Sequence, residues 1–413
     1  MIALPRYVPD YKIQINGENI PNELRSSISS VTYQDGGEDS SGKQAASRVE
    51  IEIANTNLRW LKKHIRGLGF RPFPSGVQAG LGGAQIVKAT TSSSVTHIPE
   101  GIFDLESQLS LAMGYATDYI EDVFTGEITG LDVNFPNSGM STMTLVAHDY
   151  LHRLSRGSYS RGFGPVADFL IAAILSAENL LAPIIDPSIV GASAALSIVN
   201  HVFNGSGRKQ KAQSDLELMQ EIADIYDADF WVDGNVFYLS RFLKDYSPSL
   251  SLTWGKSLLS FSPKVTTIGQ VAGISVNFTL REIPLSFVVT VSWDVDRESL
   301  VTTIIPDVCG TAVSATKTLA DPILSLINRP ISSPVDITNS ALFIARELRR
   351  KLNNRLTGTG TAIGDPRIRA GVIIRLQDLG PDFSGDYRVV SANHVIDSSG
   401  YLTQFSVRKE IIP

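Results

Sequence analysis

The chain has 413 residues, of which 43% are hydrophobic and 19% charged, a composition that suits roughly two to four globular domains with large cores. Its formal net charge of −6 argues against broad electrostatic binding to nucleic acid or to an anionic membrane surface. Cys309 is the single cysteine, so one chain can form neither a disulfide framework nor a multi-thiolate metal site.

The first 150 residues carry the pattern of short strands separated by turns. Alternating polar and apolar residues, or short apolar runs, predict strands at 11–15, 48–53, 101–105, 109–115, 123–128 and 140–147. Two stretches rich in Gly and Ser, 34–46 and 66–96, are predicted to be loops. Such a series of strands is typical of a small barrel or sandwich.

The middle of the chain changes to a mixed pattern. Helical periodicity predicts helices at 166–179 and 215–226, and Ser214 with Glu217 forms a capping box for the second. An Asp233-Gly234 turn between two apolar runs predicts a hairpin over 230–239. These elements indicate a small α+β unit.

The most apolar stretch of the chain, 170–202, is interrupted by Pro183, Asp186 and Pro187. Its second half is rich in Ala, Ser and Gly rather than in large apolar residues. We interpret it as a buried helical segment, with a membrane span as the alternative.

After residue 246 the pattern returns to β structure. Strands are predicted at 250–254, 258–261, 271–278, 286–293, 371–376, 386–395 and 401–408. A helix is predicted at 340–356, and its basic C-terminal half suits the helix dipole. The stretch 294–334 shows no clear pattern. The order along the chain is therefore β, then α+β, then β with one inserted helix.

One small cluster of residues contains candidate metal ligands. His148 and His152 stand four positions apart and could share a metal on one helix, with Asp149 between them. A zincin needs a Glu after its first His, and no third ligand is near in the sequence. If His148 belongs to a strand, the shared site is excluded. Instead of a metal site, we favour the interpretation that these are polar residues at a strand-to-helix junction.

Other motifs give no starting point for catalysis. The spacing of Gly80, Gly82, Gly83 and Lys88 does not match a phosphate-binding loop, and Cys309 lies in an irregular segment. No G-x-S-x-G elbow is present, and no carboxylate pair stands out.

The hairpin also contains acidic and aromatic residues that could have a functional role. Asp229 and Asp233 are interpreted as turn residues. The hairpin aromatics are interpreted as core packing rather than as a base-stacking platform: Phe230, Trp231, Phe237 and Tyr238. We assign no catalytic, cofactor-binding or metal-binding residue and expect no cofactor.

Several segments together resemble one family, the phage late control D or tail baseplate hub family, which includes the hub part of type VI secretion spike proteins. The matching segments are LSLAMGY at 109–115, VFTGEIT at 123–129, TLVAHDYLHRL at 144–154, QSDLELMQEIADIYDADFWVDGNVFYLS at 213–240, SLLSFSPKV at 257–265, QVAGISV at 270–276, GDPRIRAGVIIRLQDLG at 364–380 and FSGDYRVVSANHVIDSSGYLTQFSVRKE at 383–410. Their common order over nearly the whole chain is what makes the resemblance specific.

The resemblance implies two tube-like β-barrel domains, 1–150 and 246–413, joined by a mixed connector domain, 151–245. It also implies a homotrimer whose six barrels form a pseudo-sixfold ring, which adapts a trimeric spike to a hexameric tail tube beside other baseplate proteins. The stretches 66–96 and 294–334 exceed the family's usual pattern. No spike module follows the last expected strand before Pro413, so we expect a separate spike protein.

The implied setting is a phage virion or a contractile injection particle, assembled in the bacterial cytoplasm because the N-terminus shows no signal peptide. The sequence does not separate a phage from a secretion system or an extracellular particle. Two other functions stay open: a cell-wall hydrolase or metallopeptidase at the particle tip, and a carbohydrate-binding β protein that attaches to hosts. We expect neither specific nucleic-acid binding nor a membrane span.

Overall fold

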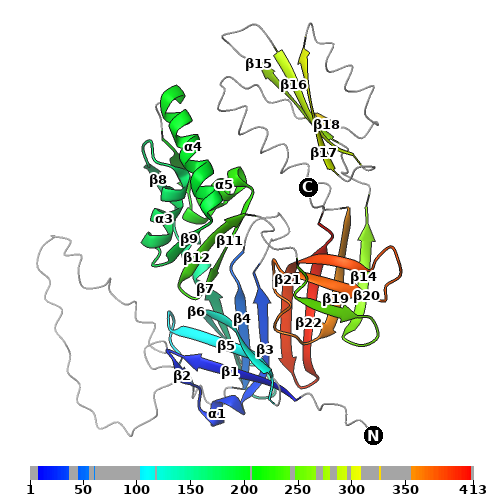
Figure 1. Ribbon diagram of the computed structural model, residues 1–413. Helices are drawn as coiled ribbons and strands as arrows, with labels where there is room; N and C mark the ends of the chain where they lie inside the picture. The colour runs from blue at the N-terminus through cyan, green and yellow to red at the C-terminus, as the bar shows by residue number, and fades with distance from the viewer. Residues whose placement is uncertain are drawn as a thin grey trace, which may run out of the picture.

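The computed structural model describes residues 8–36, 45–54, 60, 103–116, 119–204, 207–241, 247–266, 273–279, 286–294, 299–307, 325–326 and 355–410. Figure 1 shows two β blocks, a mixed α+β part and a separate small sheet; blue to cyan strands form the first block and orange to red strands most of the second. The fold is therefore mainly β, as the sequence predicts.

The N-terminal block contains seven strands and one short helix: β1 (Pro9–Ile15), β2 (Glu18–Asn19), α1 (Asn22–Arg25), β3 (Ile28–Asp35), β4 (Arg48–Ala54), β5 (Gln108–Tyr115), β6 (Tyr119–Asn134) and β7 (Thr142–Asp149). Buried side chains of β1 and β5 share one core with those of β3 and β4, so the sheet curves around that core. Of the strand predicted at 101–105, residues 103–105 are described and form no strand: Phe103 makes a single β-bridge and Leu105 lies in a turn. The start of the loop predicted at 34–46 is also wrong, since β3 continues to Asp35.

The C-terminal block continues the same sheet. It contains β13 (Leu250–Thr253), β14 (Leu258–Val265), β19 (Leu356–Ile363), β20 (Ile373–Gln377), β21 (Gly385–Asp397) and β22 (Gly400–Arg408). Strand β21 pairs antiparallel with β3, with His394 opposite Tyr33, and we call this pairing the seam. The resulting sheet has 13 strands.

The described strands of this sheet follow an open path from β14 to β2 and close into no barrel. The mainly β fold is thus confirmed, and the two predicted barrels are not. Pro263 lies within β14 opposite Gly358. This position suits proline because β14 is the last strand on the path, and an edge strand can omit one backbone donor.

The middle of the chain forms an α+β unit, which we call the middle domain. Its elements are η2 (Tyr150–Ser155), β8 (Tyr159–Gly162), α3 (Asp168–Glu178), β9 (Ala182–Ile185), α4 (Pro187–Asn204), β10 (Lys209–Gln213), α5 (Asp215–Tyr226), β11 (Ala228–Asp233) and β12 (Val236–Arg241). Both predicted helices are confirmed, and so is the Ser214–Glu217 capping box. Their apolar faces pack with the inner face of the hairpin in a separate core.

The hairpin turn differs from its prediction by one residue. Asp233 still belongs to β11 and pairs with Val236, so the loop consists of Gly234 and Asn235. Only Gly234 of these residues has a positive φ, +52°. A glycine at the first loop position is typical of a type II′ turn, whereas the prediction required two residues with positive φ.

The apolar stretch 170–202 is divided among α3, β9 and α4. Asp186 separates the last two elements, and its carboxylate accepts hydrogen bonds from the backbone N–H and the hydroxyl of Ser188 at the start of α4. Among the helices that the structure describes, none is long and apolar enough to cross a membrane.

A separate four-stranded sheet contains β15 (Gly273–Thr279), β16 (Ser286–Asp294), β17 (Ser299–Asp307) and β18 (Ser325–Leu326). The first two strands were predicted, and the other two lie in the stretch without a clear pattern. The predicted helix at 340–356 lies outside the described residues, except for Arg355 in a turn and Leu356, which begins β19. Cys309, the loop 66–96 and the glycines within that loop also lie outside them.

Candidate functional site at the junctions of the blocks

The predicted metal candidates lie where the N-terminal block meets the middle domain. His148 belongs to β7 and His152 to η2, and their ring centroids are 6.1 Å apart. Asp149 caps η2 by accepting a hydrogen bond from the Leu151 N–H. The expected strand-to-helix junction is therefore confirmed, and the two histidines do not share a helix.

Both histidines already have hydrogen-bond partners on the protein. His152 Nδ1 lies 2.5 Å from the Asp149 carbonyl oxygen, and the Arg156 guanidinium lies 2.8 Å from His152 Nε2. His148 Nδ1 contacts the hydroxyl of Thr129 at 2.6 Å. Burial lowers the pKa of each imidazole, which favours the neutral form. Among the described residues, no group of three or more His, Cys, Asp or Glu side chains is arranged to hold a metal ion.

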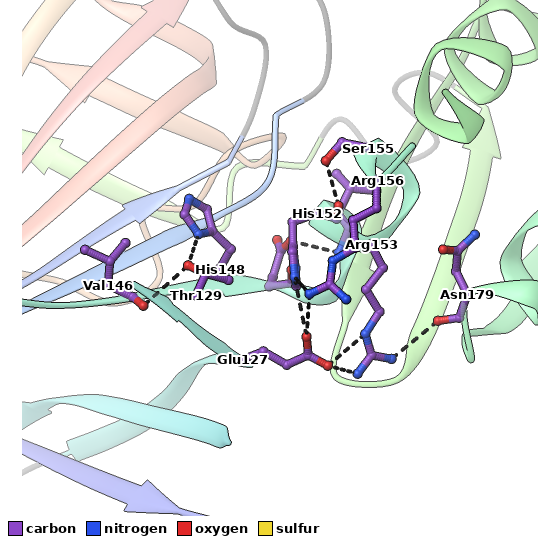
Figure 2. A network of polar contacts seen from close by, with 11 residues as sticks. Glu127, Thr129, Val146, His148, His152, Arg153, Ser155, Arg156 and Asn179 are labelled. Carbon is purple, nitrogen blue, oxygen red and sulfur yellow. Dashed lines mark hydrogen bonds and ion pairs between the residues drawn. The ribbon is translucent and has the colours of Figure 1, made fainter. Parts of the chain in front are cut away.

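Glu127 on β6 is the centre of the network in Figure 2. Its buried carboxylate accepts two hydrogen bonds from Arg153 and one from Arg156, and His152 Nε2 lies 3.4 Å away. Arg153 also donates to the carbonyl oxygen of Asn179, just after α3. This one carboxylate therefore attaches the middle domain to the N-terminal block.

A second attachment joins the middle domain to the C-terminal block. Arg388 on β21 donates to the Asp229 carboxylate on β11 at 2.6 Å. Glu410, which is also buried, lies 3.7 Å from Arg388 and accepts from Arg408 at 2.6 Å. The interpretation of Asp229 as a turn residue is wrong, because it is a strand residue opposite Ser240 and holds this ion pair.

The seam between the two β blocks contains a buried polar cluster around His394. His394 Nε2 lies 3.0 Å from the Ile368 carbonyl oxygen, and Nδ1 lies 3.0 Å from the hydroxyls of Tyr401 and Thr403. The ring stacks on Tyr33 of β3 at a centroid distance of 5.6 Å. Burial lowers the pKa of His394 to about 4, so the ring is neutral near pH 7.

A cavity of about 440 Å³ lies where all three parts meet. Asp35 and Asp149 line it from the N-terminal block, β11 from the middle domain, and 369–372 with 388–390 from the C-terminal block. Asp35 accepts from the Ala370 N–H at 2.7 Å. Burial raises the pKa of both carboxyls, that of Asp149 to about 7. Both acids accept hydrogen bonds from backbone N–H groups, and Asp35 also accepts from the hydroxyls of Tyr33 at 2.9 Å and Ser47 at 3.4 Å.

Trp231 also lines this cavity, which contradicts its predicted place in the core. Phe230 and Phe237 are fully buried, as predicted, whereas the side chain of Trp231 is 45% exposed and stacks on Tyr238 at 5.2 Å. The reason is the strand period of two: Phe230 and Val232 point inward, so Trp231 between them points outward.

The residues that make these junctions were not singled out in the sequence. Glu127 and Arg388 are each a charged residue next to large apolar residues within a predicted strand, and that signal could have identified them. His394 is a polar residue inside a predicted strand and gives a weaker signal of the same kind. Their partners are distant along the chain, so the sequence alone gives no pairing.

Neither a protein-family model nor a curated protein matches the chain. Among solved structures, a 43 kDa tail protein of prophage MuSo2 from Shewanella oneidensis is 10% identical with a TM-score of 0.59, and the match covers 97% of this chain and 98% of that one. A tail protein from Neisseria meningitidis is 9% identical with a TM-score of 0.57, over 98% and 97% of the two chains. The chain thus has the fold of these two tail proteins over nearly its whole length, and the resemblance seen in its sequence motifs is confirmed at the level of the fold.

Proposed function

We propose that the chain is a structural hub of a contractile tail or injection particle, a homotrimer that adapts a threefold spike to a hexameric tail tube. The observation that carries this proposal is the match of the whole chain, from the first block to the last, to the fold of two tail proteins. A match restricted to one β block would fit many β proteins. The order of β block, mixed domain and β block is far more specific.

The internal organisation supports the same function. Each β block has its own buried core, and a third core lies in the middle domain. Three copies of such a chain supply six β units, the number that a ring facing a hexameric tube requires. The seam joins the two units of one chain through backbone hydrogen bonds, which suits a part that transmits force.

A structural role also agrees with the chemistry of the junctions. The buried acids and histidines described above are held by arginines, hydroxyls and backbone groups within the chain. Such groups position the three parts relative to one another and need no substrate. We therefore propose a non-enzymatic role, with a separate spike protein, the tube protein and other baseplate proteins as partners in a virion or injection particle.

The oligomeric state tests this proposal most directly. Light scattering coupled to size exclusion should give about 134 kDa, three times the 44.8 kDa of one chain. Images of the particles along their axis should show a ring with six similar lobes. A chain that stays monomeric, alone and together with a tail tube protein and a spike protein, would contradict the proposal.

A further inference from the structure

His152 lies at the attachment of the middle domain to the N-terminal block, and each of its ring nitrogens has a different partner. Nδ1 lies 2.5 Å from the Asp149 carbonyl oxygen, and the Arg156 guanidinium lies 2.8 Å from Nε2. A carbonyl oxygen only accepts hydrogen bonds, and a guanidinium only donates them. His152 therefore carries its proton on Nδ1 and accepts from Arg156 at Nε2, which is the neutral form of the ring.

A protonated His152 is incompatible with this arrangement. A proton on Nε2 turns that atom into a donor, which would then face the N–H groups of Arg156. An acceptor is near, because the Glu127 carboxylate lies 3.4 Å from Nε2. Arg156 donates to the same carboxylate oxygen at 3.3 Å, and Figure 2 shows the three groups converging. A protonated ring must therefore compete with Arg156 for one oxygen atom.

The charges around the ring also oppose a further cation. Glu127 on β6 is the carboxylate of this network, and it already accepts from Arg153 and Arg156. His148 on β7 adds to the repulsion when it is protonated. The side chains of His152 and Glu127 are 13% and 11% exposed, so water screens these charges only in part.

The surroundings of His152 as a whole favour its neutral form. Burial lowers the pKa of His152, and the two arginines lower it further. The hydrogen bond to Asp149 and the charge of Glu127 raise this pKa by less. The other elements that pack on η2 are α5 and β11, which meet it through the apolar core of the middle domain. The attached state of the middle domain therefore requires a neutral ring.

We propose that His152 is an acid-sensitive switch in the attachment of the middle domain to the N-terminal block. Protonation at Nε2 displaces Arg156 from the ring and makes the two cations compete for Glu127, which weakens the attachment. The stability supplied by the neutral ring is present above about pH 6.5 and is lost as the pH falls below that value. This inference goes beyond the hub proposal and does not depend on it, because a monomeric chain contains the same attachment.

The Asp149 carboxyl at the start of η2 responds to acid in the opposite direction. Burial raises its pKa to about 7, so the folded chain binds this proton first and the attachment gains stability as the pH falls. The wild type alone therefore shows the sum of two effects. A comparison of two variants at the same pH isolates the contribution of His152, because the contribution of Asp149 is common to both proteins.

The measurement is amide hydrogen exchange of the full chain at about pH 7.5 and about pH 5.5, in the wild type and in His152→Gln. The glutamine oxygen can accept from Arg156, and the side chain binds no proton in this range. The opening equilibrium of η2 and α3 in the wild type, divided by that in the variant, should rise about three- to tenfold on acidification. Tenfold is about the limit, since an exposed imidazole of ordinary pKa 6.5 gains no more over this range.

Arg156→Gln tests the same switch from the other partner. The Arg156 side chain is 53% exposed, so this variant should fold. Without the charge of Arg156, the ring is protonated more easily in the attached state, and the ratio of wild type to variant should again rise, by at least about twofold. A ratio that does not change would overturn the proposal even if His152→Gln does not fold.

His148→Gln is the matched control, because its ring contacts the Thr129 hydroxyl within the N-terminal block. The ratio of wild type to this variant should change by less than about twofold on acidification.

Three further results would overturn the proposal. One is a ratio for His152→Gln that stays within about twofold over the whole range. Another is a ratio that falls on acidification, which would show that the contact between His152 and Glu127 strengthens the attachment when the ring is protonated. The third is an equal rise for His148→Gln, which would assign the response to the other histidine.

Discussion

The seam between the β blocks and the attachments of the middle domain are built from different interactions. The seam is a run of paired residues, from Ala392 opposite Asp35 to Ile396 opposite Val31, whose backbone groups bond across the two strands. The attachments rest on a few charged side chains, above all Glu127 and Arg388. One substitution can remove an attachment, but it cannot remove the run of backbone hydrogen bonds that forms the seam. The pairing of β3 with β21 should therefore persist in variants in which the middle domain is less firmly attached.

The largest effect is expected for Glu127→Ala. It leaves the guanidinium group of Arg153, whose side chain is 18% exposed, without its carboxylate, and breaking such a largely buried pair from one side costs about 3–5 kcal/mol. Arg156 is 53% exposed and should add little to this loss. Hydrogen exchange should speed up in α3 and α5 more than in β3 and β21. Chemical denaturation measures the total loss.

The matched control for that variant is Asp132→Ala. Asp132 lies on the same strand but is exposed, so its removal should change the free energy of unfolding by less than about 0.5 kcal/mol. Uniformly faster exchange in the Glu127→Ala protein, seam included, would show that the attachment and the seam are not independent.

A smaller loss is expected when the seam loses its buried imidazole. His394→Leu keeps most of the volume but leaves the Ile368 carbonyl oxygen without its donor, which costs about 1–3 kcal/mol. Tyr401 keeps the Thr403 hydroxyl nearby. His394→Gln, which can still donate to Ile368, should recover part of the loss. If both variants lose the same amount, the ring acts through its stacking on Tyr33 rather than through the hydrogen bond.

Two buried groups, His394 in the seam and Asp149 at the start of the middle domain, should respond to acid in opposite ways. The pKa of His394 is lowered by burial from 6.5 to about 4, so the unfolded state binds the proton first and stability falls as pH drops from about 6.5 to 4. The pKa of Asp149 is raised by burial from 3.8 to about 7, so the folded state keeps its proton and gains stability as pH falls from about 7 to 4. Burial also raises the pKa of Asp35, which acts in the same direction.

Asp149→Asn should therefore steepen the loss of stability between pH 6.5 and 4, because the opposing contribution is removed. Denaturation midpoints measured across this range, for the wild type and the variant, give the comparison. If the variant loses stability less steeply than the wild type, protonation of Asp149 destabilises the folded state, opposite to this prediction.

The smallest effect is expected at Trp231, which contributes to neither the seam nor the ion pairs. Because its side chain is 45% exposed, Trp231→Ala should lose mainly the stacking on Tyr238, about 0.5–1.5 kcal/mol. Its neighbour on the strand is the contrast, since Phe230→Ala empties a fully buried site and should cost about 3–5 kcal/mol. Thermal or chemical unfolding of the two variants side by side decides whether the two faces differ in this way.

Local patterns in the sequence predicted the local structure well. Helix α5 has the bounds that its apolar stripe and capping box indicate, because both signals lie within a few residues. The outward direction of Trp231 was also available from the alternation of its neighbours. The mainly β character followed from repeated short runs of alternating residues.

The long-range features could not be predicted in this way. Strand β3 carries few large apolar residues, and β19 (LTGTGTAI) alternates threonine with glycine, so neither stands out. Both become strands because they have neighbours on the sheet. The ion pairs join residues that are far apart, such as Arg388 and Asp229, and only the folded chain brings them together.

The seam also constrains the order of events while the chain is being made. Arg369 and Tyr33 at this junction are 336 positions apart, so β3 leaves the ribosome long before β21 exists. During that interval β3 has an open edge, which other nascent chains could join. Contacts of such high sequence separation form slowly. A truncated product that ends before β21 would keep this edge exposed, so premature termination should yield aggregates rather than a folded N-terminal half.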